Sequence, residues 1–448
     1  MVEVIPLVDS GLGNSAYLVG IGGGRALVID PSRDLRAVDA AAERYGLHVV
    51  AAADTHLHAD FLTGATRLAA RDDATVYASA VGGREFPHTG LGDGDEVDLG
   101  GLTLRAWATP GHTGEHVAYL LLDGAMTLGV FTGGSLIVGA AARTDLASPE
   151  QTEPLARAQY ASLQRLATLP DDTPVWPTHG AGSFCSAPPG AERTTTIGRE
   201  KASNPLLAAP DEDAFVTTLL GSLGTFPPYF LRLAEINRRG PALPPAGNAL
   251  PSLTVDQVMG AAGAEMIDVR PPVDYAAGHV PGSLANTLRP AFATWLGWLV
   301  PDPATPLMFV RNDDQDPEEI VWQARKIGYD HLVGELAGGI SAWVAAGQPV
   351  ATVPLLDAGD VDPARVVDVR QVSEYAGGHL PAARNVELGS LPSVNLPAGP
   401  VVTMCGHGER ATTAASVLER AGHSGVAVLA AGADEWATAT GTALEVAG

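Results

Sequence analysis

Cys405 stands in a loop whose residues could hold reactive sulfur. Residues 400–418, PVVTMCGHGERATTAASVL, have the pattern of an apolar strand, a glycine-rich turn and a helix. In such a turn the backbone N–H groups point inward and form a nest for an anion, which the helix N-terminus reinforces. That field, with Arg410 beside it, stabilises a thiolate or a bound persulfide. We therefore predict that Cys405 and Arg410 are catalytic. The neighbouring residues predicted to bind the substrate are Gly406, His407, Gly408 and Glu409.

Histidines in the first half of the chain have the spacing of metal ligands. His56 and His58 lie in DTHLHAD, His112 lies in TPGHTGEH and His179 lies in WPTHG. Each motif follows a strand-like run, and strand ends meet at one edge of a sheet, where α/β architectures place their sites. Imidazoles there bind zinc or iron, and the H-x-H spacing lets two rings flank one cavity. The sequence therefore predicts a metal site at this edge.

An internal repeat positions the cysteine loop. Residues 266–286 and 366–386 align without a gap, and the motif AGGISAW at 337–343 is echoed by AGADEWA at 431–437. Each copy alternates short apolar runs with amphipathic helices, which predicts a parallel sheet with helices on its faces. The residues that recur are Asp268, Arg270, Tyr275, His279 and Pro281, as Asp368, Arg370, Tyr375, His379 and Pro381.

The first 245 residues have a different pattern, in which strand-like runs at 26–30, 48–56, 102–110 and 117–123 alternate with helices at 35–46 and 152–167. This predicts sheets sandwiched between helices. Residues 124–142 carry no charge but contain five glycines, so we interpret them as strand–turn–strand and not as a membrane helix. The predicted domains are 1–245, 252–350 and 355–448.

Composition limits the classes of protein that fit. At about 150 residues per domain, 448 residues favour three domains. A net charge of −24, from 51 acidic and 27 basic residues, argues against binding to nucleic acid or an anionic membrane surface. Two distant cysteines do not form a disulfide framework and fit a reducing cytoplasm. The N-terminus has no basic segment or cleavage pattern, so we expect no signal peptide.

The histidine motifs THLHAD and TPGHT resemble the metallo-β-lactamase superfamily, which implies an αββα sandwich for residues 1–245. Residues 131–146 and 177–186 are most similar to its persulfide dioxygenase branch, some members of which are fused to rhodanese domains. The resemblance implies a single non-haem iron (Fe²⁺) held by two histidines and one aspartate, the facial triad of iron oxygenases. His56 and His112 match the two histidine ligands.

The chain departs from this family pattern at two positions. Gly134 stands where the family has its aspartate ligand, and Phe61 stands where the superfamily has a further histidine, which argues against a two-metal site. Three alternatives follow for the metal. Iron could bind His56 and His112, with water, Asp60 or Asp145 completing the site. A single Zn²⁺ could bind His56, His58 and His112 and activate a water. The third alternative is a domain that holds no metal and serves as a scaffold.

Cys185, in GAGSFCS, matches a cysteine that relatives carry near the metal pocket, where it could hold a sulfane sulfur. We predict it as a substrate-binding residue, and the alternative is a small buried apolar side chain.

The cysteine loop, C-x-x-G-x-R, and the DVR…EY…GHLPAA box together resemble a rhodanese domain, a persulfide-forming sulfurtransferase. Asp368 and Arg370 match its signature strand, and the resemblance gives His379 a role in stabilising the fold. In the first copy the alignment puts Arg311 at the position of the cysteine, followed by acidic residues at 312–319. We therefore predict that 252–350 is an inactive rhodanese-like copy that serves packing, dimer contact or orientation of its neighbours.

The leading hypothesis is a cytoplasmic enzyme of sulfur metabolism. By resemblance, the N-terminal domain would oxidise a low-molecular-weight persulfide with O₂ to sulfite and thiol, and Cys405 would carry sulfane sulfur, so that sulfite meeting that persulfide would give thiosulfate. The alternatives are a sulfurtransferase with a metal-free scaffold domain, a mono-zinc thioesterase similar to glyoxalase II, and a non-catalytic persulfide carrier. Because fused relatives assemble, we expect a homo-oligomer.

Overall fold

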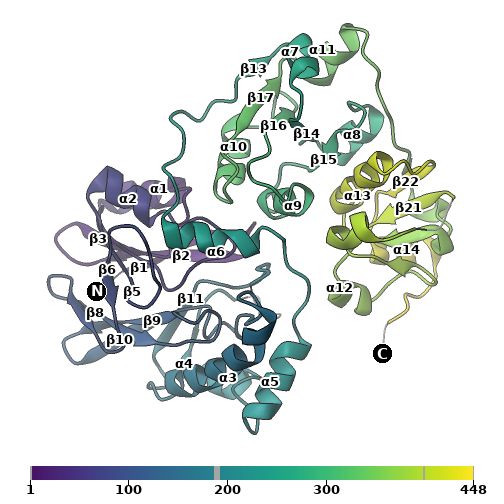
Figure 1. Cartoon of the computed structure of the whole chain (residues 1–448). Coiled ribbons are helices and arrows are strands. Elements are labelled where there is room, and N and C mark those ends of the chain that lie inside the picture. Colours follow the sequence, from purple (N-terminus) through teal and green to yellow (C-terminus); the bar gives the residue numbers. More distant parts are fainter. Residues whose placement is uncertain (1–2, 186–191, 397–398, 447–448) are drawn as a thin grey trace. The chain divides into compact units, whose positions relative to one another are not determined.

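The structure is a computed structural model that describes residues 3–185, 192–396 and 399–446. The chain divides into two compact units (Figure 1). The first contains residues 1–245 together with 325–328, and the second contains 246–324 and 329–448. The short segment 325–328, which the sequence places in the middle domain, thus groups with the N-terminal unit. The three domain boundaries remain predictions.

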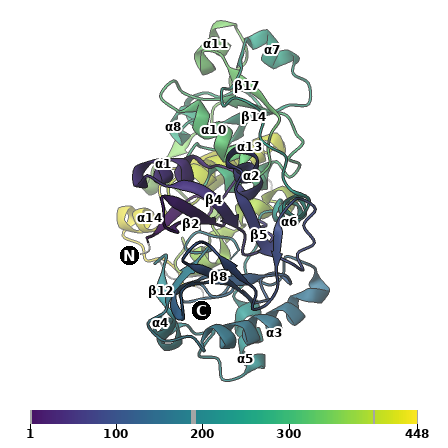
Figure 2. The ribbon, with the colours of Figure 1, turned by 90° about the vertical axis from the view of Figure 1, so that its left-hand side faces the viewer.

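The N-terminal unit contains two six-stranded sheets with helices outside them (Figure 2). The first sheet has the order β1 (Val4–Asp9), β2 (Asn14–Gly20), β3 (Arg25–Ile29), β4 (His48–Ala53), β5 (Thr75–Ser79) and β6 (Thr89–Leu91). The second has the order β12 (Thr195–Thr196), β11 (Pro174–Pro177), β10 (Met126–Gly133), β9 (Val117–Asp123), β8 (Thr103–Ala108) and β7 (Glu96–Asp98). The helices are α1 (Arg36–Tyr45), α2 (Ala65–Asp72), α3 (Pro149–Leu166), α4 (Ile197–Ser203), α5 (Glu212–Gly221) and α6 (Phe230–Arg239).

Strand alternation separates the interior of this unit into layers. Tyr17 and Val19 of β2 pack between the two sheets, whereas Leu18 points to the other face, against α1 and α2. In β9 the same alternation sends Tyr119 to the inter-sheet core and Leu120 toward α3 and α5. Successive side chains of a strand point to opposite faces, so two buried faces require a continuous apolar run. The predicted αββα sandwich is therefore confirmed.

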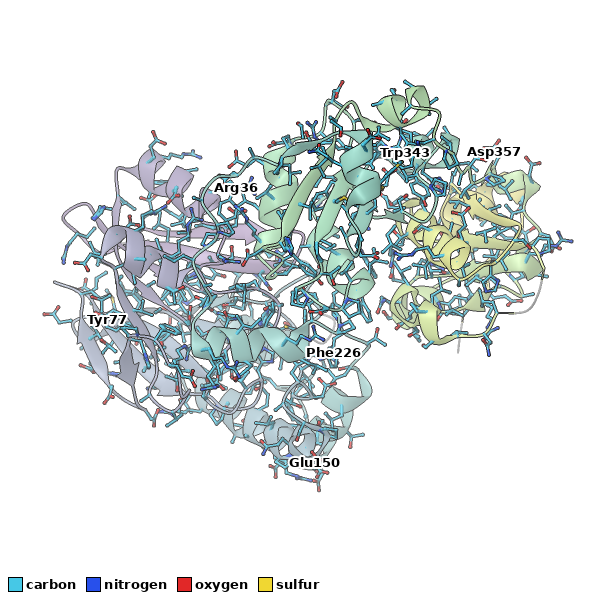
Figure 3. The ribbon with its side chains drawn as sticks, turned by 45° about the horizontal axis from the view of Figure 1, so that its top comes forward. Arg36, Tyr77, Glu150, Phe226, Trp343 and Asp357 are labelled. Carbon is cyan, nitrogen blue, oxygen red and sulfur yellow. The ribbon has the colours of Figure 1, made fainter. Side chains whose placement is uncertain are left out.

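The uncharged run 124–142 differs in part from the prediction. It contains the turn before β10 and then β10 itself, but a loop follows in place of a second strand, with a single bridge between Ile137 and Ala140. The loop leads to α3, which begins at Pro149 with Glu150 exposed in its first turn (Figure 3). Among the described residues, no helix is both long and apolar enough to cross a bilayer.

The second unit contains two five-stranded parallel sheets with the same strand order, as the repeat predicts. The first copy has the order β13 (Ser252–Leu253), β17 (Leu332–Leu336), β16 (Leu307–Val310), β14 (Glu265–Asp268) and β15 (Leu284–Ala285). Its helices are α7 (Val255–Gly260), α8 (Pro272–Ala277), α9 (Phe292–Leu299), α10 (Pro317–Arg325) and α11 (Gly339–Ala345). The second copy has the order β18 (Leu355–Leu356), β22 (Val426–Leu429), β21 (Val401–Met404), β19 (Val366–Asp368) and β20 (Arg384–Asn385). Its α-helices are α12 (Val372–Ala376), α13 (Glu409–Arg420) and α14 (Ala433–Thr440).

The recurring residues of the repeat hold each copy together. Arg370 donates to both carboxylate oxygens of Asp368 and to the carbonyl oxygen of Gly378. His379 stacks on Tyr375, with ring centroids 3.7 Å apart, and its Nδ1 lies 3.0 Å from the Tyr375 carbonyl oxygen. The equivalent residues of the first copy make the same contacts. These contacts give the histidine a structural role in both copies.

Candidate functional site

The strand ends of the N-terminal unit bring together the four histidines that the sequence singles out. The ring of His56 lies 4.2 Å from that of His58, 4.7 Å from that of His112 and 5.2 Å from that of His179, measured between centroids. All four are buried. His116 was not predicted as part of this cluster, yet its ring stacks 5.1 Å from that of His56. Its position four residues after His112 in TPGHTGEH was the only signal in the sequence.

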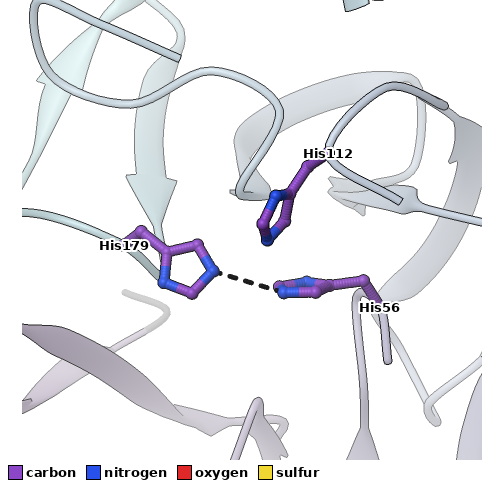
Figure 4. A group of neighbouring side chains, drawn as sticks. All are labelled: His56, His112 and His179. Carbon is purple, nitrogen blue, oxygen red and sulfur yellow. Dashed lines mark hydrogen bonds between the residues drawn. The ribbon is translucent and has the colours of Figure 1, made fainter. Parts of the chain in front are cut away.

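Three of these imidazoles point toward one another (Figure 4). One nitrogen each of His56, His112 and His179 lies within 4.8 Å of the others, and the Nε2 atoms of His56 and His179 are 3.2 Å apart. Burial, together with the neighbouring imidazoles, lowers the pKa of His112 and of His179 to about 3. The rings are therefore neutral at neutral pH, which is the form that binds a metal ion.

Hydrogen bonds at the Nδ1 atoms, which point away from the other imidazoles, fix the orientation of two of these rings. Nδ1 of His112 lies 2.7 Å from the Arg143 carbonyl oxygen, and Nδ1 of His179 lies 2.9 Å from Oδ1 of Asn14. The Arg143 side chain donates to Asp145 at 2.7 and 2.8 Å, and its guanidinium carbon lies 4.4 Å from the centre of the Phe226 ring. In known metal sites, hydrogen bonds to the ring nitrogen that does not bind the metal orient the histidine ligands.

His58 belongs to a different set of contacts from the one that the zinc alternative requires. Its Nε2 lies 3.1 Å from Oδ1 of Asp30, and burial would lower its pKa, but the charge of Asp30 raises it. Its donor atoms group with those of Asp30 and His56, whereas the donor atom that groups with those of His56 and His112 belongs to His179. The assignment of ligands remains a prediction.

Gly134 lies against the ring of His112. A Cβ atom at this position would lie 2.5 Å from Cδ2 of His112, closer than such atoms approach in proteins. The space that the expected aspartate would need is therefore filled by the imidazole. Neither of the substitutes considered from the sequence joins the three converging nitrogens: Asp145 pairs with Arg143 at 2.7 Å, and Asp60 groups with His179 and Cys185.

Cys185 is fully buried and lies beside Asp60. Burial raises the pKa of its thiol well above the usual value, and the Asp60 carboxylate raises it further. Burial likewise raises the pKa of Asp60, whose Oδ2 accepts a hydrogen bond of 2.6 Å from Asn14. This environment disfavours a thiolate, so the predicted role of Cys185 in binding sulfur requires a partner that stabilises the anion.

In the second unit, Cys405 follows the last residue of β21, as predicted. Its Sγ atom accepts a hydrogen bond of 3.2 Å from the backbone N–H of Gly408. Gly408 has a φ of 90°, which only glycine adopts without strain, and it precedes the first residue of α13. The sulfur thus lies at the N-terminus of a helix of 12 residues, where the peptide dipoles favour negative charge.

A pocket of about 510 Å³ borders the loop at Gly406 and His407 and extends to Arg370 and Glu374. Arg410, predicted to be catalytic, donates to Glu374 through Nη1 at 2.7 Å and Nη2 at 2.8 Å. No local pattern in the sequence predicts this ion pair. The positive charge expected to attract an anion is therefore largely compensated by a carboxylate.

The first copy lacks the equivalent site. Arg311 follows β16 as Cys405 follows β21, and its guanidinium pairs with both carboxylate oxygens of Glu335. Its Nη1 also donates to the carbonyl oxygens of Asn312 and Gln315. The turn is thus closed by its own residues and contains no thiol.

The first copy does contact the cysteine loop of the second. The ring of Trp295, in α9, lies 5.9 Å from the guanidinium carbon of Arg410. Arg289 lies close enough to interact electrostatically with Cys405, Glu409 and Arg410, and burial lowers its pKa. Elsewhere, Arg420 of α13 pairs with Glu265 of β14 at 2.6 Å. Arg289 and Trp295 were not predicted from the sequence, because nothing in their local pattern marks them.

Known proteins resemble both units. The family profile of the rhodanese-like domain matches residues 254–346 and 354–439. The human mitochondrial persulfide dioxygenase ETHE1 is 30% identical over 202 residues, which cover 44% of this chain and 72% of the human protein. The chain belongs to the family of persulfide dioxygenases fused to rhodanese domains.

Further relatives share only part of this family architecture. A hydroxyacylglutathione hydrolase from Acidiphilium cryptum is 36% identical over 164 residues, 36% of this chain, and the match spans 61% of the hydrolase, less than two thirds of its length. The crystal structure of a metallo-β-lactamase from Staphylococcus aureus COL matches with a TM-score of 0.67 and 28% identity, over 75% of this chain and 98% of the staphylococcal one. The match to the rhodanese-like profile and to a persulfide dioxygenase supports a role in sulfur metabolism, and the histidine clusters could hold a metal.

Proposed function

We propose that the chain oxidises a low-molecular-weight persulfide with O₂ and passes sulfane sulfur through a persulfide on Cys405. The single observation that carries the proposal is the position of the Cys405 sulfur, at the N-terminus of α13 and on the Gly408 N–H. The oxidation half is supported by the buried imidazole cluster and by the similarity to the human persulfide dioxygenase.

The transfer half needs only residues of the second unit. A thiolate at Cys405 attacks the outer sulfur of thiosulfate or of a persulfide, the S–S bond of the donor breaks, and sulfite or thiol leaves. The Gly408 N–H and the helix N-terminus stabilise the negative charge on Cys405 before and after transfer. An acceptor such as cyanide or sulfite then takes the outer sulfur and returns the Cys405 thiolate.

The oxidation half needs a metal, and the buried neutral imidazoles fit one. His56, His112 and His179 are the residues that would hold it. Iron bound there would supply binding of O₂ and its reduction. The protein supplies a buried, preoriented set of nitrogens, and Arg143 and Asn14 keep the rings in place.

The oxidation and transfer reactions balance in atoms and electrons when they follow one another. One persulfide, one O₂ and one water give one thiol, one sulfite and two protons, because the outer sulfur loses four electrons and O₂ accepts them. Sulfite then attacks the outer sulfur of the Cys405 persulfide, the S–S bond breaks toward Cys405, and thiosulfate is released. The substrates are thus anions, which must be attracted locally against a net charge of −24.

Hydrolysis of a glutathione thioester is the second candidate. It is favoured by the 36% identity to a hydroxyacylglutathione hydrolase over 164 residues. Zinc on three imidazoles would supply an activated water for this reaction. The rhodanese-like copies would then act independently of the N-terminal unit.

Two measurements test the proposal. Transfer of sulfur from thiosulfate to cyanide should fall by about 1000-fold or more in Cys405→Ser, since the nucleophile is lost, while the matched Cys185→Ser stays within about twofold. Protein that contains iron should consume O₂ with glutathione persulfide and release sulfite. Sulfur transfer that survives in Cys405→Ser contradicts the proposed transfer through Cys405. The proposed oxidation is contradicted if iron-loaded protein consumes no O₂, or if zinc-loaded protein hydrolyses S-lactoylglutathione.

A further inference from the structure

We propose that His56, His112 and His179 form a site for one divalent metal ion in which His179 takes the place of the carboxylate that the family uses. The donor set would then be three neutral imidazoles. The inference deepens the proposed metal-dependent chemistry and rests on it for its biological meaning. Its test measures metal binding alone, so that either can fail without the other.

Two of the rings present a free Nε2 lone pair because of what their Nδ1 atoms contact. The Arg143 carbonyl oxygen can only accept, so Nδ1 of His112 carries the proton in their 2.7 Å hydrogen bond. Asn14 donates its NH₂ group to Asp60 and therefore turns Oδ1 toward His179. Nδ1 of His179 is then also the protonated nitrogen.

The third ring is oriented through Thr55 and Asp30. The Thr55 hydroxyl donates to Oδ2 of Asp30 at 2.7 Å, so its oxygen is left to accept from Nδ1 of His56 at 2.8 Å. A fully buried carboxylate needs such donors, and Asp30 also accepts from the backbone N–H of Thr55. His56 thus has the same tautomer as the other two rings.

Three lone pairs therefore converge in a buried space. The Nε2 atoms of His56 and His179, at 3.2 Å, have no proton to share, and Nε2 of His112 has no hydrogen-bond partner among the described residues. Buried acceptors that face one another without a donor are unfavourable, and a cation between them removes the cost. Neutral imidazole nitrogens of this kind are ligands for zinc, iron and cobalt.

The position of Gly134 explains why the third ligand is a histidine. A side chain here would collide with the His112 ring, so a carboxylate at 134 and His112 in its observed place exclude each other. His58 is the other candidate for the third ligand. Its Nε2 is engaged with Asp30, and its donors do not group with His112.

A neutral donor set changes the charge of the site. Two histidines and a carboxylate leave one positive charge on a divalent ion, whereas three imidazoles leave two. In a buried site this favours an anionic further ligand. The class of ligand that fits is an anionic sulfur donor, such as a deprotonated persulfide or thiosulfate, in keeping with the proposed function.

The test is cobalt binding to the full chain after removal of metal with a chelator. We expect one Co²⁺ per chain, with visible absorption bands, and a fall in affinity of about 100-fold or more in His179→Gln, beyond the 10- to 100-fold typical of an orienting residue. For Asn14→Ala the loss of Co²⁺ affinity should lie within that 10- to 100-fold range, because Asn14 only orients His179. His88→Gln, outside the cluster, is the matched control and should bind as the parent chain does.

Two further variants can overturn the assignment. If His58→Gln loses Co²⁺ while His179→Gln binds it normally, the ligands are His56, His58 and His112. If Gly134→Asp binds more tightly than the parent, the carboxylate site of the family is intact; we expect weaker binding, since the new side chain displaces His112. Retained thiosulfate-to-cyanide transfer in each variant shows that the second unit is folded, and circular dichroism reports on the first. Absence of Co²⁺ binding in the folded parent chain refutes the site.

Discussion

Arg410 and Glu374 form a bidentate ion pair in the Cys405 site, with N–O distances of 2.7 and 2.8 Å. The sequence places Arg410 in the loop of Cys405 but says nothing of Glu374, which lies in α12. The carboxylate holds the guanidinium in one orientation and cancels much of its charge. Anion binding at Cys405 must therefore depend on more than Arg410.

Removing the charge of Glu374 should strengthen the binding of thiosulfate. In Glu374→Gln the amide oxygen still accepts one hydrogen bond from Arg410, while the local charge becomes more positive. We expect KM for thiosulfate to fall by about threefold with kcat within twofold, which corresponds to loss of a ground-state repulsion. Asp362→Asn, which removes an exposed carboxylate of the same copy, is the control. A raised KM would mean that Glu374 serves mainly to position Arg410.

Arg289 of the cysteine-free copy should contribute to the same anion site. Its charge acts on Cys405 and is not part of the Arg410–Glu374 pair. We expect Arg289→Gln to raise KM for thiosulfate by about fivefold with little change in kcat, and Arg289→Lys to restore most of the loss. The exposed Arg384, replaced by Gln, is the matched control. Equal KM values in all these variants would leave the first copy a purely structural role.

The buried pair of the signature strand should stabilise the second copy. The side chain of Asp368 is fully buried and pairs with Arg370 at 2.6 Å. Asp368→Asn leaves Arg370 without its counter-charge, and loss of one partner of a buried pair costs about 3–5 kcal/mol. Calorimetry should show a lower melting temperature for the transition that abolishes sulfur transfer. The exposed pair of Arg365 and Asp362 offers the comparison, and its loss should have almost no effect.

The pH dependence of stability should report on Glu374. Its burial would raise the pKa, but the hydrogen bonds and charge of Arg410 prevail and lower it below the ordinary 4.5. A carboxyl group with a lowered pKa stabilises the fold above its ordinary pKa, and the contribution is lost as the pH falls through the folded value. The difference in melting temperature between the parent chain and Glu374→Gln should therefore be constant from neutral pH down to about pH 5 and shrink below it. A difference that grows on acidification would contradict the assignment.

The sequence determined the architecture of this chain because its signals are local. The apolar run before His56 forms β4, and the run 117–123 forms β9. The two copies of the repeat, marked by Asp268 and Asp368, form two sheets of the same strand order. Alternation, glycine turns and helix starts are decided within a few residues, so they can be recognised without knowing the fold. The same is true of the cysteine loop and of its replacement by Arg311.

Tertiary structure decided which of the predicted residues act together. His56 and His179 are 123 positions apart, and only the packing of two sheets brings their Nε2 atoms to 3.2 Å. The ring of His112 fills the space left by Gly134, a relationship that no local pattern expresses. The physical reason is that a metal or anion site depends on the direction of side chains, and those directions are set by hydrogen bonds and packing between segments far apart in the sequence.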